Sequence, residues 1–117
     1  MNRERLYGGS FGIDTAHTRE LYDSRASRAG SGEIGVNTAV LLGDQNPSYA
    51  EEWDSSEKKG ILPLLEVDCS SRVLDLGCGL GRWARTLMPR CGAYTGVDFS
   101  SQMIALARER CMEYCSE

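Results

Sequence analysis

The stretch VLDLGCGLGRW, residues 73–83, decides the fold of this chain. A short apolar run that carries Asp75 leads directly into three glycines at alternate positions, Gly77, Gly79 and Gly81. Near-continuous apolar character is typical of a strand covered on both faces of a sheet. Glycine has no Cβ atom, so a ligand can approach the main chain, and N–H groups at a following helix start are free to meet it. The spacing therefore predicts a strand, a tight turn and a helix, with a ligand at the turn.

The flanking sequence extends this unit to two strands and two helices. The expected elements, in chain order, are strand 72–76, helix 81–88, strand 93–97 and helix 101–114. Pro89 ends the first of these helices. The second carries an apolar stripe formed by Ile104, Ala107, Cys111 and Tyr114. Since strand–helix–strand connections are right-handed and leave the two strands parallel, the fold class is α/β.

The chain divides into three regions. Residues 1–13 are polar and contain several glycines, which predicts a flexible lead-in. Residues 14–68 are expected to be helical, with helices at 14–29, 36–42 and 48–65, the last weakened by Gly60 and Pro63. The first of these helices carries one apolar face, formed by Leu21, Tyr22, Ala26 and Ala29. Residues 69–117 hold the strand–helix unit.

Composition excludes several classes of partner. The net charge is -4 and the isoelectric point is about 5.0, which argues against a nucleic-acid backbone as the main ligand. No apolar segment approaches the roughly 18 residues of a membrane span. The N-terminus MNRERLYGGS lacks the apolar core of a signal peptide. We therefore expect a cytoplasmic protein that binds neither nucleic acid nor membrane.

Five cysteines raise the question of a metal site or a disulfide framework. The count is odd, no Cys-x-x-Cys pair occurs, and His17 is the only histidine of the sequence. Cys111 and Cys115 lie one helical turn apart, but two ligands do not make a structural zinc site. The sequence predicts no metal and mostly buried, reduced thiols.

Two features narrow the choice of ligand. The dinucleotide fingerprint would place its third glycine at Arg82, and the phosphate-binding P-loop needs a Lys and a Ser or Thr that are absent. The second strand ends in Asp98, where a carboxylate can accept hydrogen bonds from ribose hydroxyls. Asp98 as the N-cap of the last helix is the alternative, although Ser100 or Ser101 could serve there. A turn without a ligand is the alternative for the glycines, but three at this spacing disfavour it.

The two motifs together resemble those of a known family. VLDLGCGLGRW, followed by YTGVDFSSQMIALAR at residues 94–108, is similar to the first two motifs of class I S-adenosylmethionine-dependent methyltransferases. The resemblance implies N-terminal helices followed by the first βαβα unit of a Rossmann-like sheet. It also implies S-adenosyl-L-methionine as the cofactor, so that residues 69–117 would be part of its binding domain and residues 14–68 a lid or cap.

The resemblance assigns roles to individual residues. It places the cofactor loop at Asp75, Gly77, Cys78, Gly79 and Gly81. It makes Asp98 the residue that holds the ribose hydroxyls and Phe99 the neighbour of the adenine. More loosely, it places Tyr22 and Arg25 near the carboxylate of the cofactor; a packed Tyr and a surface Arg are the alternative. Asp75 would orient the loop and lie near the cationic end of the methionine.

The sequence departs from the family in one respect: the family's sheet has seven strands, and two are expected here. We expect a fragment of a longer enzyme, or a truncated chain that associates with itself or with another chain, as a homo-oligomer through exposed sheet edges in the first case. The implied activity is methyl transfer to an unidentified small-molecule or sugar acceptor, with this chain alone inactive and no catalytic residue evident. The alternatives are a non-catalytic Rossmann-like remnant that acts as a cofactor-binding or protein-interaction module and, more weakly, another Rossmann-like nucleotide binder.

Overall fold

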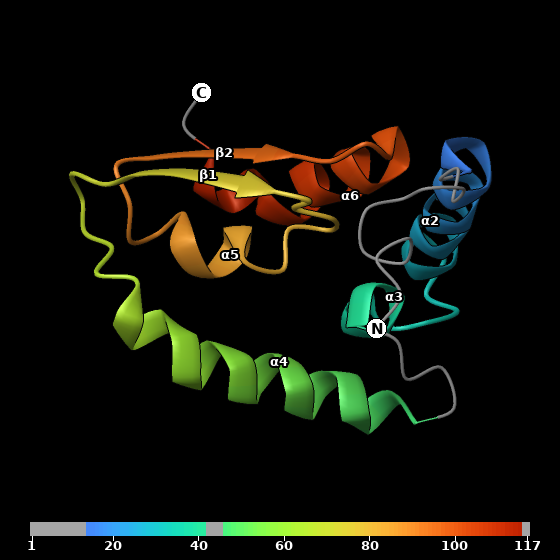
Figure 1. The fold of residues 1–117 in the computed structure, drawn as a ribbon, viewed down its shortest axis with the longest axis horizontal. Coiled ribbons are helices and arrows are strands. Elements are labelled where there is room, and N and C mark those ends of the chain that lie inside the picture. Colours follow the sequence, from blue (N-terminus) through green and yellow to red (C-terminus); the bar gives the residue numbers. More distant parts are fainter. Residues whose placement is uncertain (1–13, 42–45, 116–117) are drawn as a thin grey trace, which may run out of the picture.

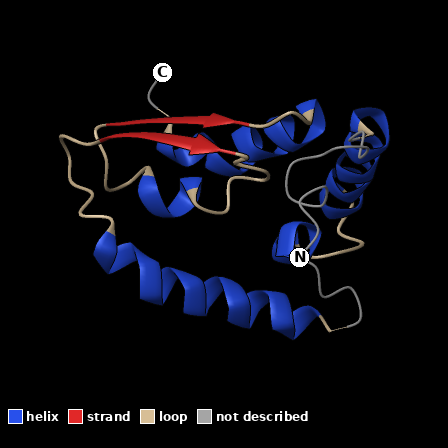
Figure 2. Ribbon diagram, viewed as in Figure 1, coloured by secondary structure: helices blue, strands red, loops and turns tan. Residues whose placement is uncertain are grey.

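The computed structural model describes residues 14–41 and 46–115, and the predicted lead-in at residues 1–13 lies outside these ranges. Figure 1 shows a two-stranded sheet with helices along one side and further helices beyond the carboxyl ends of the strands. Figure 2 shows that the two strands run in the same direction. The arrangement is the α/β fold that the sequence predicts, with N-terminal helices followed by one βαβα unit.

Three helices precede the sheet. Helix α2 spans Thr15–Gly30, and its N-cap Asp14 accepts a hydrogen bond from the N–H of His17 at 2.9 Å. Helix α3 spans Val36–Leu41. Helix α4 spans Pro47–Ile61 and continues into the 3-10 turn η1, Leu62–Leu64. Proline fits the first turn of α4 because its missing N–H would have no helical partner there. The three predicted helical segments are confirmed to within a few residues.

The sheet consists of two parallel strands with the predicted bounds. Strand β1 spans Arg72–Leu76 and strand β2 spans Ala93–Val97, with Asp75 opposite Gly96 in the register. The loop between β1 and the next helix is longer than predicted, because helix α5 spans only Ala84–Leu87. The physical reason is the positive φ of the glycines before it, described below, which an α-helix cannot contain. Helix α6 spans Ser101–Cys111 and ends in the 3-10 turn η2, Met112–Tyr114.

The hydrophobic core lies where the N-terminal helices meet the glycine loop. Its buried centre consists of Ala26, Ala39, Leu80 and Met103, which come from α2, α3, the loop and α6 respectively. Tyr22 and Ala29 of α2 pack against this centre as predicted, whereas Leu21 is 48% exposed. The core therefore fixes helices α2 and α3 directly against the loop that follows β1.

One face of the sheet is open among the described residues. Exposed and half-buried positions alternate along both strands, and the exposed set includes Leu74, Leu76 and Val97, at 63%, 74% and 42% of their surface. The prediction that β1 is covered on both faces is therefore wrong for the described residues, since helices lie along only one side of the sheet (Figure 1). The apolar residues of the strands favour burial, but no described segment covers them on the outer face of the sheet.

We expect the 117-residue chain to associate with itself through this open face and the unpaired strand edges, because both favour contact with a second copy. Sedimentation velocity at micromolar concentration measures the association. Leu76→Ser should reduce it at a cost in stability within about 0.5 kcal/mol, since the side chain is already exposed. As a control, Leu80→Ala should cost about 2–5 kcal/mol. A monomeric wild-type chain would contradict the expectation.

Candidate cofactor-binding site

The glycine loop after β1 has an unusual backbone. Gly77, Gly79 and Gly81 all take positive φ values, of 75°, 53° and 77° respectively. Side-chain-bearing residues rarely adopt this region, so the alternating glycines are needed for the path of the chain itself. The loop turns the chain sharply away from β1 before α5 begins.

The N–H groups of this loop are used inside the protein. Those of Gly77 and Cys78 both donate to the carbonyl oxygen of Val97, at 2.8 and 3.0 Å, and that of Gly81 donates to the Cys78 carbonyl at 3.0 Å. The N–H of Gly79 donates to Asp98. The expectation of N–H groups free for a ligand is therefore wrong at these four positions. The loop instead leaves its backbone accessible to a ligand, because the glycines have no side chains.

The three glycines differ in the space around them. A Cβ atom at Gly79 would lie 3.2 Å from Val40, and one at Gly81 would lie 3.1 Å from the sulfur of Cys111, whereas one at Gly77 would meet no protein atom within 4 Å. Gly79 and Gly81 are thus packed against the protein. Of the three loop glycines, Gly77 is the one with open space beside it.

Asp98 joins the end of β2 to the loop. Its Oδ2 atom accepts from the N–H of Gly79 at 3.0 Å, and its Oδ1 atom accepts from the N–H of Ser100 at 2.9 Å. The cap of α6 is Ser100, whose hydroxyl oxygen accepts from the N–H of Met103 at 3.1 Å. The N-cap interpretation of Asp98 is therefore wrong. Each carboxylate oxygen of Asp98 can accept a further hydrogen bond, so the half-buried side chain retains the capacity to bind a diol.

Asp75 lies on the side of β1 that faces the helices. Its carboxylate accepts a hydrogen bond from the hydroxyl of Tyr94, on the neighbouring strand, at 2.5 Å. Burial, and then Asp75 itself, raise the pKa of Tyr94. Tyr94 is a partner that sequence reasoning missed, although its position two residues before the Gly96 that pairs with Asp75 places it on the same face of the sheet.

Cys78 is buried within the loop. Burial, and then the charges of Asp75 and Asp98, raise the pKa of its thiol from 9.0 to about 11. The prediction of buried thiols holds for Cys78 and Cys111, whereas Cys69 and Cys115 are exposed. Cys78 is therefore a protonated, packed side chain of the loop.

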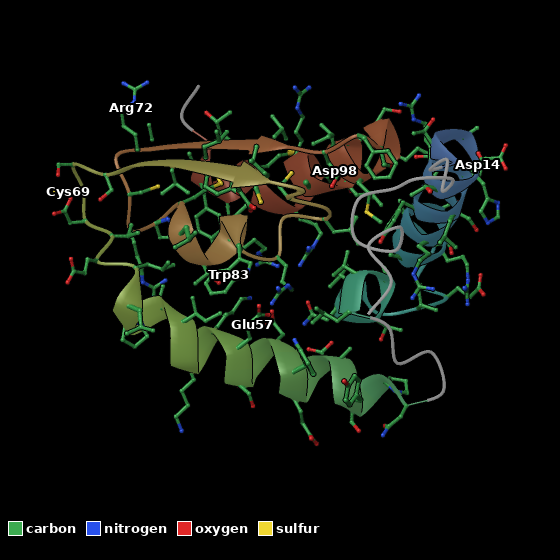
Figure 3. The ribbon with its side chains drawn as sticks, in the orientation of Figure 1. Asp14, Glu57, Cys69, Arg72, Trp83 and Asp98 are labelled. Carbon is green, nitrogen blue, oxygen red and sulfur yellow. The ribbon has the colours of Figure 1, made fainter. Side chains whose placement is uncertain are left out.

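Helix α2 lies beside Asp98, at the end of β2 (Figure 3). The rings of Tyr22 and Phe99 meet edge to face, with centroids 5.6 Å apart, and Phe99 remains 46% exposed. The Ser100 hydroxyl donates a hydrogen bond to Asp23 of the same helix. The structure thus brings Tyr22 and Phe99 together next to Asp98, and Asp23 is a further contact that the sequence did not indicate.

Arg25 is buried rather than on the surface. Its guanidinium donates to the carbonyl oxygens of Ala39 and Thr38 at 2.6 and 2.7 Å, so the side chain holds α3 against α2. The two outcomes considered for this residue were a contact with a ligand carboxylate and a surface position. The observed bonds give Arg25 a role in the fold that neither interpretation included.

A group of ion pairs at the end of the loop was also missed. Arg82 contacts Asp54 and Glu57 of α4, each at 2.8 Å. Asp54 lies 28 residues before Arg82 in the sequence, so no local sequence pattern indicates this contact. The only indication in the sequence was the spacing of Asp54 and Glu57, which lie three residues apart and so share one face of α4.

Comparisons with known proteins agree with this geometry. Residues 73–116 match the family described as methyltransferase domain. The chain is 34% identical over 61 residues to demethylmenaquinone methyltransferase from two strains of Tropheryma whipplei, an alignment that covers 52% of this chain and 26% of the relative. It is 39% identical over 51 residues to an uncharacterized methyltransferase of Schizosaccharomyces pombe, covering 44% and 20% of the two chains.

A solved structure has the same fold. Phosphoethanolamine N-methyltransferase 1 of Haemonchus contortus, in complex with phosphoethanolamine and S-adenosylhomocysteine, superposes with a TM-score of 0.63 at 18% identity. The match covers 88% of this chain and 21% of that structure. The fold is therefore similar to the Rossmann-like fold of a methyltransferase. The resemblance to the S-adenosylmethionine-dependent enzymes of this class is thereby confirmed, and the chain spans about a quarter of the curated relatives it matches.

Among residues 14–41 and 46–115, no helix is both long and apolar enough to cross a membrane. Within the part of the chain that the structure describes, no group of three His, Cys, Asp or Glu side chains is arranged to hold a metal ion.

The raised pKa of Cys78 leads to a prediction about its reactivity. A thiol with a pKa of about 11 carries roughly a hundredfold less thiolate at pH 8 than one near 9. We expect iodoacetamide to label Cys78 at least about tenfold more slowly than exposed Cys69, and the rate at Cys78 to keep rising as the pH approaches 11. Peptide mass spectrometry measures both rates. Equal labelling of the two thiols at pH 8 would contradict the burial of Cys78.

Proposed function

We propose that this chain is the cofactor-binding portion of an S-adenosylmethionine-dependent methyltransferase that acts on a small-molecule or sugar acceptor. The observation that carries the proposal is the left-handed glycine loop after β1, held by Asp98 at the end of β2. In an open parallel sheet, ligands bind outside the carboxyl ends of the strands, where this loop and Asp98 lie. The comparisons support methyl transfer as the chemistry, and the acceptor is part of the proposal.

The residues of the loop have distinct roles in this proposal. The bound cofactor would supply an activated methyl group on a sulfonium. Gly77 would give it access to the backbone, Asp98 would accept hydrogen bonds from its ribose hydroxyls, and Phe99 would pack beside its adenine. The carboxylates of Asp75 and Asp98, which both act on the Cys78 thiol, would favour a cationic ligand. Positioning of the acceptor would then account for most of the catalysis.

Tyr22 and Arg25 have separate parts in the proposal. Tyr22, already in contact with Phe99, would complete the wall next to the adenine side of the site. Arg25, whose guanidinium donates to the carbonyl oxygens of Ala39 and Thr38, would lie near the carboxylate of the cofactor. Helix α2 would thus serve as the lid of the site, with residues 14–68 as the cap region.

A non-catalytic function is the second candidate, and the open sheet face favours it. Leu74 and Leu76 expose more than half of their surface, which suits a module that binds a protein or another copy of this chain. For the enzyme, we propose a small-molecule acceptor as the partner. We further propose that the chain associates with itself, binds neither nucleic acid nor membrane, and is located in the cytoplasm. Turnover of labelled cofactor separates the two candidates: cofactor binding without turnover on any acceptor favours the non-catalytic module.

The first test of the proposal compares two ligands. We expect the chain to bind S-adenosylhomocysteine, the demethylated cofactor, more tightly than NAD, because Arg82 occupies the position of the third glycine of a dinucleotide loop. Isothermal titration calorimetry with both ligands under the same conditions measures the preference. Tighter binding of NAD would overturn the assignment.

The second test uses two glycines in matched environments. Gly77 and Gly32 have φ values of 75° and 80°, and a Cβ atom at either meets no protein atom within 4 Å. Alanine at each position should cost about 1 kcal/mol of stability through backbone strain alone. Because a ligand would occupy the space beside Gly77, Gly77→Ala should also weaken S-adenosylhomocysteine binding, by about tenfold or more, whereas Gly32→Ala should not. Calorimetry at a temperature where both variants are folded measures the effect; equal affinities would mean that the loop is purely structural.

A further inference from the structure

The glycine loop has few side chains of its own that can anchor it. Gly77, Gly79 and Gly81 have no side chains, and glycine loses more backbone freedom on ordering than any other residue. Leu80 anchors the middle of the loop in the core. The end of the loop, where Gly81 passes into Arg82, is held from two sides by arginine side chains.

The first of these arginines reaches the loop from α6. The guanidinium of Arg110 donates a hydrogen bond to the carbonyl oxygen of Leu80. The second is Arg82, which projects from the loop to α4. Its Nη1 atom donates to Asp54 Oδ1 at 2.8 Å and lies 2.8 Å from Glu57 Oε2.

The Arg82 ion pairs are largely withdrawn from solvent. The side chains of Arg82, Asp54 and Glu57 are 13%, 15% and 29% exposed. Asp54 also accepts from Lys58 at 2.9 Å. Burial acts to raise the pKa of Asp54, but hydrogen bonds from Arg82 and Lys58 outweigh it, so the pKa lies below its ordinary value. Such pairs are harder to break than exposed ones, because a lost partner leaves a poorly solvated charge.

The ring of Trp83 completes the cluster. The guanidinium carbon of Arg82 lies 5.6 Å from the ring centroid, and Lys58 Nζ lies 5.9 Å from it. Figure 3 shows Glu57 and Trp83 in the space between α4 and α5. The cluster therefore connects helix α4 to Arg82, the residue that directly follows the last loop glycine.

We infer that Arg82 is a positioning residue: its ion pairs with Asp54 and Glu57 hold the glycine loop in its ligand-ready conformation and couple that conformation to the placement of α4. A loop held in this way loses less freedom when a ligand binds, so its affinity is higher. The statement about ligand affinity rests on the proposed function; the statement about loop order does not.

The experiment compares three variants with a matched control. Arg82→Met removes the cation, Arg82→Lys keeps the charge without the fork, and the double variant Asp54→Asn/Glu57→Gln neutralises the α4 side. Arg85→Met is the control, because Arg85 lies on α5 and its ion pair with Glu113, at 3.2 Å, is exposed at both ends, 44% and 59%.

The first measurement is amide hydrogen exchange in the full chain without ligand. The N–H groups of Gly79 and Gly81 are both hydrogen-bonded and report loop order. We expect them to exchange severalfold faster in Arg82→Met and in the double variant, with an intermediate rate in Arg82→Lys and the wild-type rate in Arg85→Met. Amides in the middle of α2 should keep their rates. Unchanged rates at Gly79 and Gly81, or an equal increase throughout α2, would overturn the inference; if Arg82→Met does not fold, Arg82→Lys and the double variant decide.

The second measurement is the affinity for S-adenosylhomocysteine, by calorimetry on the folded variants. We expect a loss of about five- to tenfold in Arg82→Met and in the double variant, and none in Arg85→Met. Faster loop exchange with wild-type affinity would overturn the ligand-positioning role. A wild-type chain that binds no S-adenosylhomocysteine would contradict the proposed function, and the exchange rates would still decide whether Arg82 orders the loop.

Discussion

The burial of Leu80 is the contact on which the arrangement of this chain depends. The side chain is 1% exposed and sits among Ala26, Ala39 and Met103, so a single residue of the glycine loop joins α2, α3 and α6. Its burial is worth about 2–3 kcal/mol. Val40 of α3 lies against Gly79, so α3 meets the loop at a second point beside Leu80.

The strands could be predicted from the sequence, since the signals that define them are local. Strands β1 and β2 have the predicted bounds, 72–76 and 93–97. A short apolar run beside a glycine turn indicates a strand from a few neighbouring residues alone. The resemblance of the two motifs also placed Asp98 beside the loop. The start of α5 was misjudged because glycine permits either sign of φ, and the sequence does not say which one is used.

Contacts between distant residues could not be predicted in this way. The Ser100–Asp23 bond joins residues 77 apart, and the Arg82–Asp54 pair joins residues 28 apart. Neither contact leaves a periodic pattern, because each joins single polar or charged side chains from elements that are far apart in the sequence. The burial of Arg25 was missed for a related reason: its partners are backbone carbonyl oxygens, which every residue type possesses.

The close approach of Gly96 to Cys78 has a consequence for how this sequence can diverge. A Cβ atom at position 96 would lie 2.9 Å from the Cys78 sulfur and 3.0 Å from its Cβ, with Tyr94 at 3.2 Å. The two positions therefore share one small volume. A larger residue at position 96 requires a smaller one at position 78. If position 96 is enlarged first, the new side chain clashes with Cys78, so the change at position 78 must come first. Homologous sequences should accordingly show paired substitutions at these two sites, with their combined side-chain volume conserved more closely than either residue.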